Sequence, residues 1–496
     1  MANDLSQIQN IVVLMLENRS FDNMLGWQLG LDPSLFNLSD QGERIYVWGK
    51  RDGSIDYPTM TIPDPDPGEL FTDINYQLFE RYFTPGVEPP PPATMGGFVR
   101  DYYNQTIATG DAYDPRAIMH CFDPSEVPST SSLAAAFGVS RHWYASAPCQ
   151  TWPNRFFVHT ASADGYVNNT PNPAWKVVER FPYDMPTIFN QIKERFWQLD
   201  KGWRIYFHDF SQAILLSELW LHLDHFHGYQ RFKDDVGKGD LQQYSFIEPR
   251  YYPNLEQTKM PNDQHPPHDV SLGEQLIADV YNTLRASSYW TKTLLVVIWD
   301  EHGGCYDSVP PPPAQSPDDG RSPRKGQDGY DFNFNRYGVR VPNLLISPYI
   351  PAGIVDPPGD VPFDHTTVIK TVRECFKLSG GPLTKRDAVA PSLAHALTLD
   401  SSNLNMGPEE LAMPLYQPPQ ETVAAAANAP LTGFQTALLY GADSLPSRIE
   451  APLYAAELRL GHRPSMRPLP HRTPAEARPH IRAKLTELLG RKEGED

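Results

Sequence analysis

The sequence has few cysteines and lacks the features that mark several common classes of protein. Its four cysteines form no C-x-x-C pair, so neither a zinc–thiolate site nor a disulfide-rich secreted module is expected. The longest apolar runs, 11–16 and 294–299, hold six residues each, far fewer than the ~18 that span a bilayer. We therefore expect no transmembrane segment and at most peripheral contact with a membrane.

The N-terminal residues MANDLSQIQN lack the basic, apolar and cleavage regions of a signal peptide. This absence predicts a cytoplasmic protein. A chain whose leader had already been removed would read the same way, and its setting would then be extracytoplasmic.

The chain also lacks an excess of positive charge. Its 42 lysines and arginines stand against 60 aspartates and glutamates, which gives a net charge of −18. Binding to a phosphate backbone needs a basic field, so nucleic acid is not an expected partner. The 50 prolines among 496 residues are about twice the usual share of ~5%, and they favour long ordered loops over a helical bundle.

Three apolar segments predict strands of an α/β fold. Residues 11–16 (IVVLML), 294–299 (LLVVIW) and 341–346 (VPNLLI) are runs typical of central strands in mostly parallel sheets. Residues 272–287 and 366–378 have helical spacing before the second run and after the third. Alternating strands and helices predict a central sheet flanked by helices, with the functional site beyond the carboxyl ends of the strands.

Oxygen-bearing side chains follow two of these predicted strands. Glu17 and Asn18 come directly after the first strand, and Asp300 and Glu301 directly after the second. Such oxygens suit a hard divalent cation, and adjacent carboxylates repel each other unless a cation or a proton relieves them. Two glycines after His302 allow the loop to approach a ligand closely. The alternatives are a capped turn at the first strand and a solvent-exposed acidic turn at the second.

Thr151 and Arg155 lie in the string Thr-Trp-Pro-Asn-Arg. A hydroxyl followed by a rigid x-Pro-x-Arg can present a nucleophile beside a guanidinium, which pairs with phosphate or sulfate oxygens. This is the spacing of the sulfatase signature, in which a Cys or Ser is oxidised to an aldehyde. Threonine cannot form that aldehyde and Cys149 lies two positions too early, so phosphate is favoured. The alternative is a loop threonine that begins a helix as its N-cap.

Histidines are the candidates for proton transfer. His265 and His268 lie in HPPHDV, His208 in FHDF and His365 in FDHTT. A histidine beside a phosphate can protonate a leaving oxygen or bind a non-bridging one. Taken singly, each is also consistent with an ordinary loop or core histidine.

Six strings, taken in order, resemble one family: ENRSFDNMLG, PCQTWPNRFFVHTAS, YSFIEPRYY, NDQHPPHDVSLGE, VVIWDEHGGCYDSVPPP and GVRVPNLLISPYI. They are similar to the non-specific phospholipase C and acid phosphatase family of phosphoesterases, in the alkaline-phosphatase-like superfamily. The resemblance covers about residues 8–390. It implies an alkaline-phosphatase-like α/β sandwich, with 1–400 as the phosphoesterase catalytic domain. Residues 401–496 would be a C-terminal extension or small domain of unknown role.

The resemblance also implies a metal-assisted phosphohydrolase and carries roles over by position. The four oxygen donors match the family's metal ligands, and Thr151 matches its hydroxyl nucleophile. The further candidates for catalysis are His265, His208 and His365. The candidates for substrate binding are Arg155 and His302.

The expected reaction is phospholipase C-type cleavage of glycerophospholipids, such as phosphatidylcholine, through a phosphothreonine intermediate. The alternatives are a broad-specificity acid phosphatase acting on monoesters and a non-catalytic phosphate-binding scaffold. An oxygen-rich ligand set without thiolate favours Ca²⁺, Mg²⁺ or Mn²⁺, while Zn²⁺ and Fe stay open. The basic tail 472–492 is interpreted as a solvated surface helix, with contact to an anionic membrane as the alternative.

Overall fold

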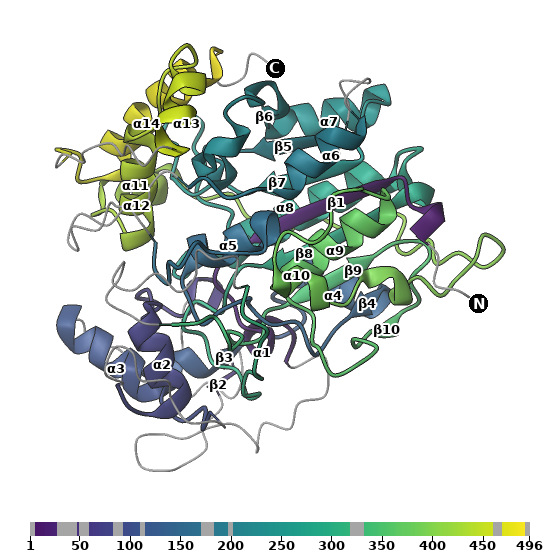
Figure 1. Cartoon of the computed structure of the whole chain (residues 1–496). Coiled ribbons are helices and arrows are strands. Elements are labelled where there is room, and N and C mark those ends of the chain that lie inside the picture. The colour runs from purple at the N-terminus through teal and green to yellow at the C-terminus, as the bar shows by residue number, and fades with distance from the viewer. Residues whose placement is uncertain are drawn as a thin grey trace.

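The computed structural model describes residues 5–26, 47–48, 59–82, 93–109, 115–169, 183–196, 202–317, 332–459 and 469–491. Its centre is an eight-stranded sheet with the order β10-β4-β9-β8-β1-β7-β5-β6, shown in Figure 1. The strands of this sheet are β1 (Asn10–Leu16), β4 (Gly138–Val139), β5 (Trp203–Phe207), β6 (Phe226–Gly228), β7 (Tyr244–Glu248), β8 (Thr293–Trp299), β9 (Asn343–Ile346) and β10 (Gly353–Ile354). A second sheet pairs β2 (Val47–Trp48) with β3 (His120–Cys121).

The central strands are parallel, as the apolar runs predicted. β1 pairs in parallel with β8 on one side and β7 on the other, and β5 continues the parallel order to β6. Every residue of β1 and β8 is buried, because both strands are covered on both faces. The predicted α/β fold with a mostly parallel central sheet is therefore confirmed.

The structure differs from the sequence expectation in two places. The third predicted strand, 341–346, forms only over Asn343–Ile346 and pairs antiparallel with β8. Pro342 lacks an amide hydrogen and so cannot join the ladder, which explains the late start. The proline content predicted long loops, but the proline-rich segment 51–97 contains the helix α2 (Phe71–Phe79). Residues 51–58 and 83–92 of this segment, and 318–331 of the proline-rich segment 307–335, lie outside the described residues.

Helices cover both faces of the central sheet (Figure 1). One layer contains α5, which contacts α6 and α9, and the other contains α8, which contacts α4 and α7. The larger helices of residues 1–400 are α2 (Phe71–Phe79), α3 (Phe98–Thr109), α4 (Pro128–Ala136), α5 (Thr151–Thr160), α6 (Ile188–Phe196), α7 (Tyr229–Lys238), α8 (Val270–Arg285) and α9 (Thr366–Cys375), with the shorter α1 (Phe21–Leu25) and α10 (Lys385–Val389). In the described part of the chain, no helix combines the length and apolar character that a membrane crossing needs.

The C-terminal residues lie along α8 before they form helices of their own. Residues 408–418, which we call the strap, receive hydrogen bonds from Gln275, Tyr281 and Asn282 of α8. The amide of Asn282 pairs with the backbone of Leu411 in both directions, at 2.9 and 2.8 Å. Four helices then gather at one corner of the molecule (Figure 1): α11 (Gln420–Asn428), α12 (Gly433–Asp443), α13 (Ala451–Arg459) and α14 (Pro474–Leu489).

A buried ion pair joins α10 to the core beneath the 363–366 segment. Arg386 is fully buried, and its guanidinium lies 3.2 Å from Asp364 and donates to the carbonyl oxygens of Ser146 and Phe334. Removing one partner of such a pair leaves an uncompensated buried charge. We expect Arg386→Met to lower the free energy of unfolding by about 3–5 kcal/mol, measured by chemical denaturation.

The matched control is Arg141→Met. Arg141 is half exposed, and its Nη2 lies 2.7 Å from Asp356 Oδ2 in an ion pair that this substitution removes. Water screens that pair, so its loss should change the free energy of unfolding by less than about 1 kcal/mol. Equal effects of the two substitutions would contradict a structural role for the buried pair.

Candidate active site

The register of two strands brings the predicted acidic residues together. Leu16 of β1 is paired with Trp299 of β8, so Glu17 and Asp300 leave the sheet side by side at its carboxyl edge. The backbone amide of Asn18 donates to Asp300 Oδ1 at 2.9 Å. The two strand ends therefore form one site, as their shared position beyond the sheet predicted.

Thr151 is the first residue of α5 and faces this site. Its hydroxyl lies 3.1 Å from Glu17 Oε2 and 3.2 Å from Asn18 Oδ1. The N-terminal end of a helix carries partial positive charge from its unpaired amides, which favours an anion such as a phosphate group. The structure thus places the predicted nucleophile against two of the predicted metal ligands.

Arg155 lies one helical turn after Thr151 on the same face of α5. Its Nε donates to Glu17 Oε1 at 2.8 Å, and its Nη2 donates to the carbonyl oxygens of Met15 and Leu16 at 3.0 and 3.1 Å. The side chain is only 1% exposed. The guanidinium therefore lies beneath the strand ends, where it pairs with Glu17. Among the described residues its Nη1 is buried without a hydrogen bond, and the phosphate contact of Arg155 stays a prediction.

The loop after β8 approaches Asn18 closely enough to require glycine. Gly303 has φ +58°, and a Cβ atom there would lie 2.5 Å from both Cβ and O of Asn18. The Gly303 amide in turn donates to Glu301 Oε2 at 2.8 Å. His302 is buried between Glu301 Oε2, at 3.1 Å, and Gln77 Oε1, at 2.8 Å. Both ring nitrogens of His302 therefore have protein partners within the site, and its role in substrate binding stays a prediction.

The site holds more negative charge than its own cation balances. Burial raises the pKa of Glu17 well above its ordinary value, although Arg155 opposes this. Burial also raises the pKa of Glu301, and the neighbouring carboxylates of Glu69 and Asp300 raise it further. Within the described residues, Asp300 Oδ2 and Glu301 Oε1 are buried without a hydrogen bond. These observations fit a bound cation, whose positive charge would compensate the carboxylates.

Two further carboxylates reach the site from the proline-rich segment that precedes α2. Glu69 Oε2 accepts a hydrogen bond of 2.6 Å from the Asn18 amide. Asp66, Glu69 and His265 hold ligand atoms that lie within 4.8 Å of one another, which is a second arrangement able to hold a metal. Neither Asp66 nor Glu69 belongs to a motif that was predicted from the sequence. The alternation of aspartate and proline in PDPDPGE was the available signal, because rigid spacing can fix carboxylates.

His265 is the predicted histidine whose ring faces the carboxylates. Its Nδ1 lies 2.6 Å from the carbonyl oxygen of Pro266, while its Nε2 lies 3.6 Å from Glu69 Oε1 and has no hydrogen bond in the described structure. Burial alone would lower the pKa of His265, but Asp66 and Glu69 raise it well above its ordinary value. These carboxylates favour the protonated ring, whose Nε2 faces Glu69.

The other two predicted histidines have different surroundings. His365 is buried, with Nε2 2.6 Å from the Asp300 carbonyl oxygen and Nδ1 3.4 Å from the Trp143 indole nitrogen. It therefore holds the strand end that carries Asp300. His208 lies after β5, where it stacks on Tyr229 and its Nδ1 lies 3.1 Å from the Glu248 carbonyl oxygen. Among the described residues, no recorded contact joins His208 to Thr151 or to the carboxylates around it.

A helix from the C-terminal part completes one wall of the site. Phe434 of α12 stacks on His265 with ring centroids 5.7 Å apart and an angle of 12° between the rings. The neighbouring Gln435 donates to the Tyr251 carbonyl oxygen at 3.1 Å, and the Tyr252 hydroxyl donates to the Gln435 carbonyl oxygen at 2.5 Å. No role for this segment was predicted from the sequence, because a phenylalanine in a helix belongs to no motif that indicates a function.

Solved structures match this chain only at low similarity. A protein in the alkaline phosphatase superfamily from Vibrio parahaemolyticus matches with a TM-score of 0.36 and 12% identity, over 79% of this chain and 72% of its own. The fold assignment here rests on the chain's own sheet order.

Similarity in sequence is much stronger. Non-specific phospholipase C3 of Arabidopsis thaliana is 36% identical over 409 residues, which are 78% of this chain and 73% of the relative. Non-specific phospholipase C5 of the same plant is 35% identical over 461 residues, 88% of this chain and 82% of the relative. The model of the phosphoesterase family matches residues 8–379. With its strand-end carboxylates and helix-borne hydroxyl in one place, the chain belongs to the phosphoesterase family and is a phosphoric ester hydrolase.

Proposed function

We propose that this enzyme cleaves glycerophospholipids in the manner of a phospholipase C, releasing diacylglycerol and a phosphorylated headgroup. The observation that carries the proposal is the position of the Thr151 hydroxyl, at the start of α5 and 3.1 Å from Glu17. The names of the relatives, non-specific phospholipases C, support the choice of a phosphodiester lipid over a monoester.

We further propose that four side chains hold a divalent cation through their oxygens: Glu17, Asn18, Asp300 and Glu301. When bound, the cation would supply positive charge that stabilises the phosphoryl oxygens and lowers the pKa of the Thr151 hydroxyl. The buried oxygens of Asp300 and Glu301 that lack hydrogen bonds support this assignment.

In the first step, the Thr151 oxygen forms a bond to phosphorus as the bond from phosphorus to the glycerol oxygen breaks. Glu17 Oε2, 3.1 Å from the hydroxyl oxygen, accepts the hydroxyl proton. The departing glycerol oxygen takes a proton from His265 Nε2, so that neutral diacylglycerol leaves. The headgroup remains esterified to Thr151 through its phosphate.

In the second step, water attacks the same phosphorus and the bond to Thr151 breaks. His265, now neutral, accepts a proton from the water, and Glu17 returns its proton to the Thr151 oxygen. The free headgroup phosphate leaves and the enzyme is restored. Positioning of these groups and the electrostatics of the site provide most of the rate, as in other phosphoryl transfers.

Replacement of Thr151 tests the covalent route. Thr151→Ala removes the attacking oxygen, so hydrolysis of dihexanoyl phosphatidylcholine should fall by several orders of magnitude, about 10⁴-fold or more. Thr151→Ser keeps the hydroxyl and should retain a measurable rate. Mass spectrometry of acid-quenched enzyme should detect the phosphorylated headgroup on residue 151 of the wild type and not of the alanine variant.

The same assay separates the substrate and metal assignments. A phosphomonoester, p-nitrophenyl phosphate, run in parallel should react with a lower kcat/KM than the diester. Chelator should abolish both activities, and Ca²⁺, Mg²⁺ or Mn²⁺ should restore them. Near-normal turnover by Thr151→Ala would rule out the phosphothreonine route, and full activity after exhaustive chelation would rule out the cation.

Replacement of His265 tests its role as the general acid. For a diacylglycerol leaving group, His265→Gln should lower kcat by about 10²–10⁴-fold, because an alkoxide is a poor leaving group without a proton. With p-nitrophenyl phosphorylcholine the loss should be much smaller, since nitrophenolate leaves unprotonated. His365→Gln is the matched control and should affect both substrates equally, because His365 holds the Asp300 backbone. Equal losses for the two leaving groups in His265→Gln would refute the assignment.

A further inference from the structure

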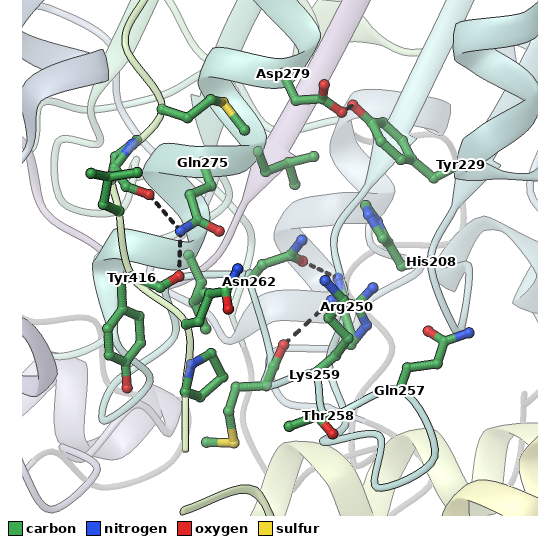
Figure 2. Close-up of a pocket in the computed structure, with 18 of the residues that line it drawn as sticks. His208, Tyr229, Arg250, Gln257, Thr258, Lys259, Asn262, Gln275, Asp279 and Tyr416 are labelled. Carbon is green, nitrogen blue, oxygen red and sulfur yellow. Dashed lines mark hydrogen bonds between the residues drawn. The ribbon is translucent and has the colours of Figure 1, made fainter. Parts of the chain in front are cut away.

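A cavity of about 900 Å³ lies apart from the carboxylate cluster, between α7, α8, the loop 249–262 and the strap. Figure 2 shows His208 and Arg250 on one side of it and Gln275 and Tyr416 on the other. No described member of the cluster around Thr151 lines it. Its volume falls within the range of small-molecule sites, and the catalytic residues make no use of it.

The charged residues of the cavity are mainly cationic. Arg250, Lys259 and Lys233 line it, against the single carboxylate of Asp279. Asp279 is already engaged, because Lys233 lies 2.8 Å from its Oδ1 and the Tyr229 hydroxyl donates to its Oδ2 at 2.8 Å. Lys259 is exposed, and within the described residues no ion pair or side-chain hydrogen bond is recorded for its ammonium group. Arg250 Nη1 also donates to the Met260 carbonyl oxygen at 3.4 Å. Three cationic side chains and one carboxylate thus line the cavity in a chain whose net charge is −18, and this lining favours an anion.

Apolar side chains line the cavity beside the charged ones. Leu272 and Leu276 project from α8, and Met260 comes from the loop that carries Lys259. The strap adds Met413 and Pro414. An anion alone would use only the cationic side chains, whereas a ligand with an anionic head and a hydrocarbon chain would use both kinds of side chain.

The strap that closes the cavity is fixed by specific hydrogen bonds. The Gln275 side chain donates to the carbonyl oxygens of Pro414 and Tyr416, at 2.8 and 2.7 Å (Figure 2). These strap residues lie beyond residue 379, where the match to the family model ends. The cavity is therefore assembled jointly by the family-matched part and the C-terminal part of this chain.

We propose that this cavity binds an anionic amphiphile, with a phosphate-type head on Arg250 and Lys259 and a hydrocarbon chain against Leu272, Leu276 and the strap. The planar guanidinium of Arg250 can pair with two oxygens of such a head, and Lys259 adds a mobile charge. The site is independent of the reaction at Thr151 and goes beyond the proposed activity.

The test is isothermal titration calorimetry of the full chain with dodecylphosphonate below its micelle concentration. This probe carries an anionic head on a C–P bond that ester hydrolysis does not cleave. Inorganic phosphate supplies the head without the chain, and dodecyltrimethylammonium supplies the chain with the opposite charge. We expect dodecylphosphonate to bind at least about tenfold more tightly than inorganic phosphate, and the cationic amphiphile to show no saturable binding.

The variants locate the site. Lys259→Gln should weaken dodecylphosphonate binding by about fivefold, and Lys259→Gln combined with Arg250→Gln by about twentyfold or more. The matched control is Lys238→Gln, an exposed lysine of α7 paired with Asp234 and absent from the lining, which should leave the affinity unchanged. Lys259→Gln should also keep wild-type kcat/KM for p-nitrophenyl phosphate, which shows that the reaction site is intact.

Three results would overturn the proposal. Unchanged affinity in the double variant would place the amphiphile elsewhere. Equal losses of dodecylphosphonate affinity in Lys238→Gln and Lys259→Gln would mean that binding depends only on the general surface charge. Equal affinities for inorganic phosphate and dodecylphosphonate would make the cavity a free-phosphate site. Because calorimetry needs no turnover, failure of the proposed phospholipase activity would leave this test valid.

Discussion

The burial of several carboxylates against a single guanidinium is the constraint on which this structure depends. Glu17 and Asp300 are driven together because β1 and β8 end in register, and Arg155 is the arginine beneath them. Such crowding is costly unless positive charge balances it. Arg155 and His265 balance part of the negative charge of these carboxylates. The negative charge that they leave unbalanced makes the site suited to a cation.

Helix α5 couples the nucleophile to this charge balance. Thr151 and Arg155 are four residues apart, so the hydroxyl and the guanidinium lie on one face of one rigid element, and both contact Glu17. Any shift of α5 would therefore move the hydroxyl of the proposed nucleophile and the counter-charge together. Such coupling keeps the distance between nucleophile and acidic residues fixed, which is what catalysis by positioning requires.

The C-terminal part is integrated with the catalytic part. α12 places Phe434 on the ring of His265, and the strap is held along α8 by Gln275 and Asn282. A histidine that donates a proton needs a fixed orientation as well as a suitable pKa. Stacking on Phe434 restricts the rotation of the ring, while the Pro266 carbonyl oxygen engages its Nδ1. The residues beyond the family match thus shape both the reaction site and the cationic cavity.

The sequence by itself determined the central parallel strands and the residues that follow them. The runs before Glu17 and Asp300 are apolar throughout, which favours strands buried on both faces, and parallel neighbouring strands place their carboxyl ends at one edge of the sheet. Tertiary structure alone decided what each side chain contacts. In the folded chain Arg155 contacts Glu17, and His302 lies between Glu301 and Gln77. His208 contacts the Glu248 backbone and not Thr151. Glu69 and Phe434 reach the site from segments without a recognisable motif. The reason is physical. Local hydrophobicity predicts which strands are buried, whereas the partner of a buried polar group depends on which distant segment packs against it.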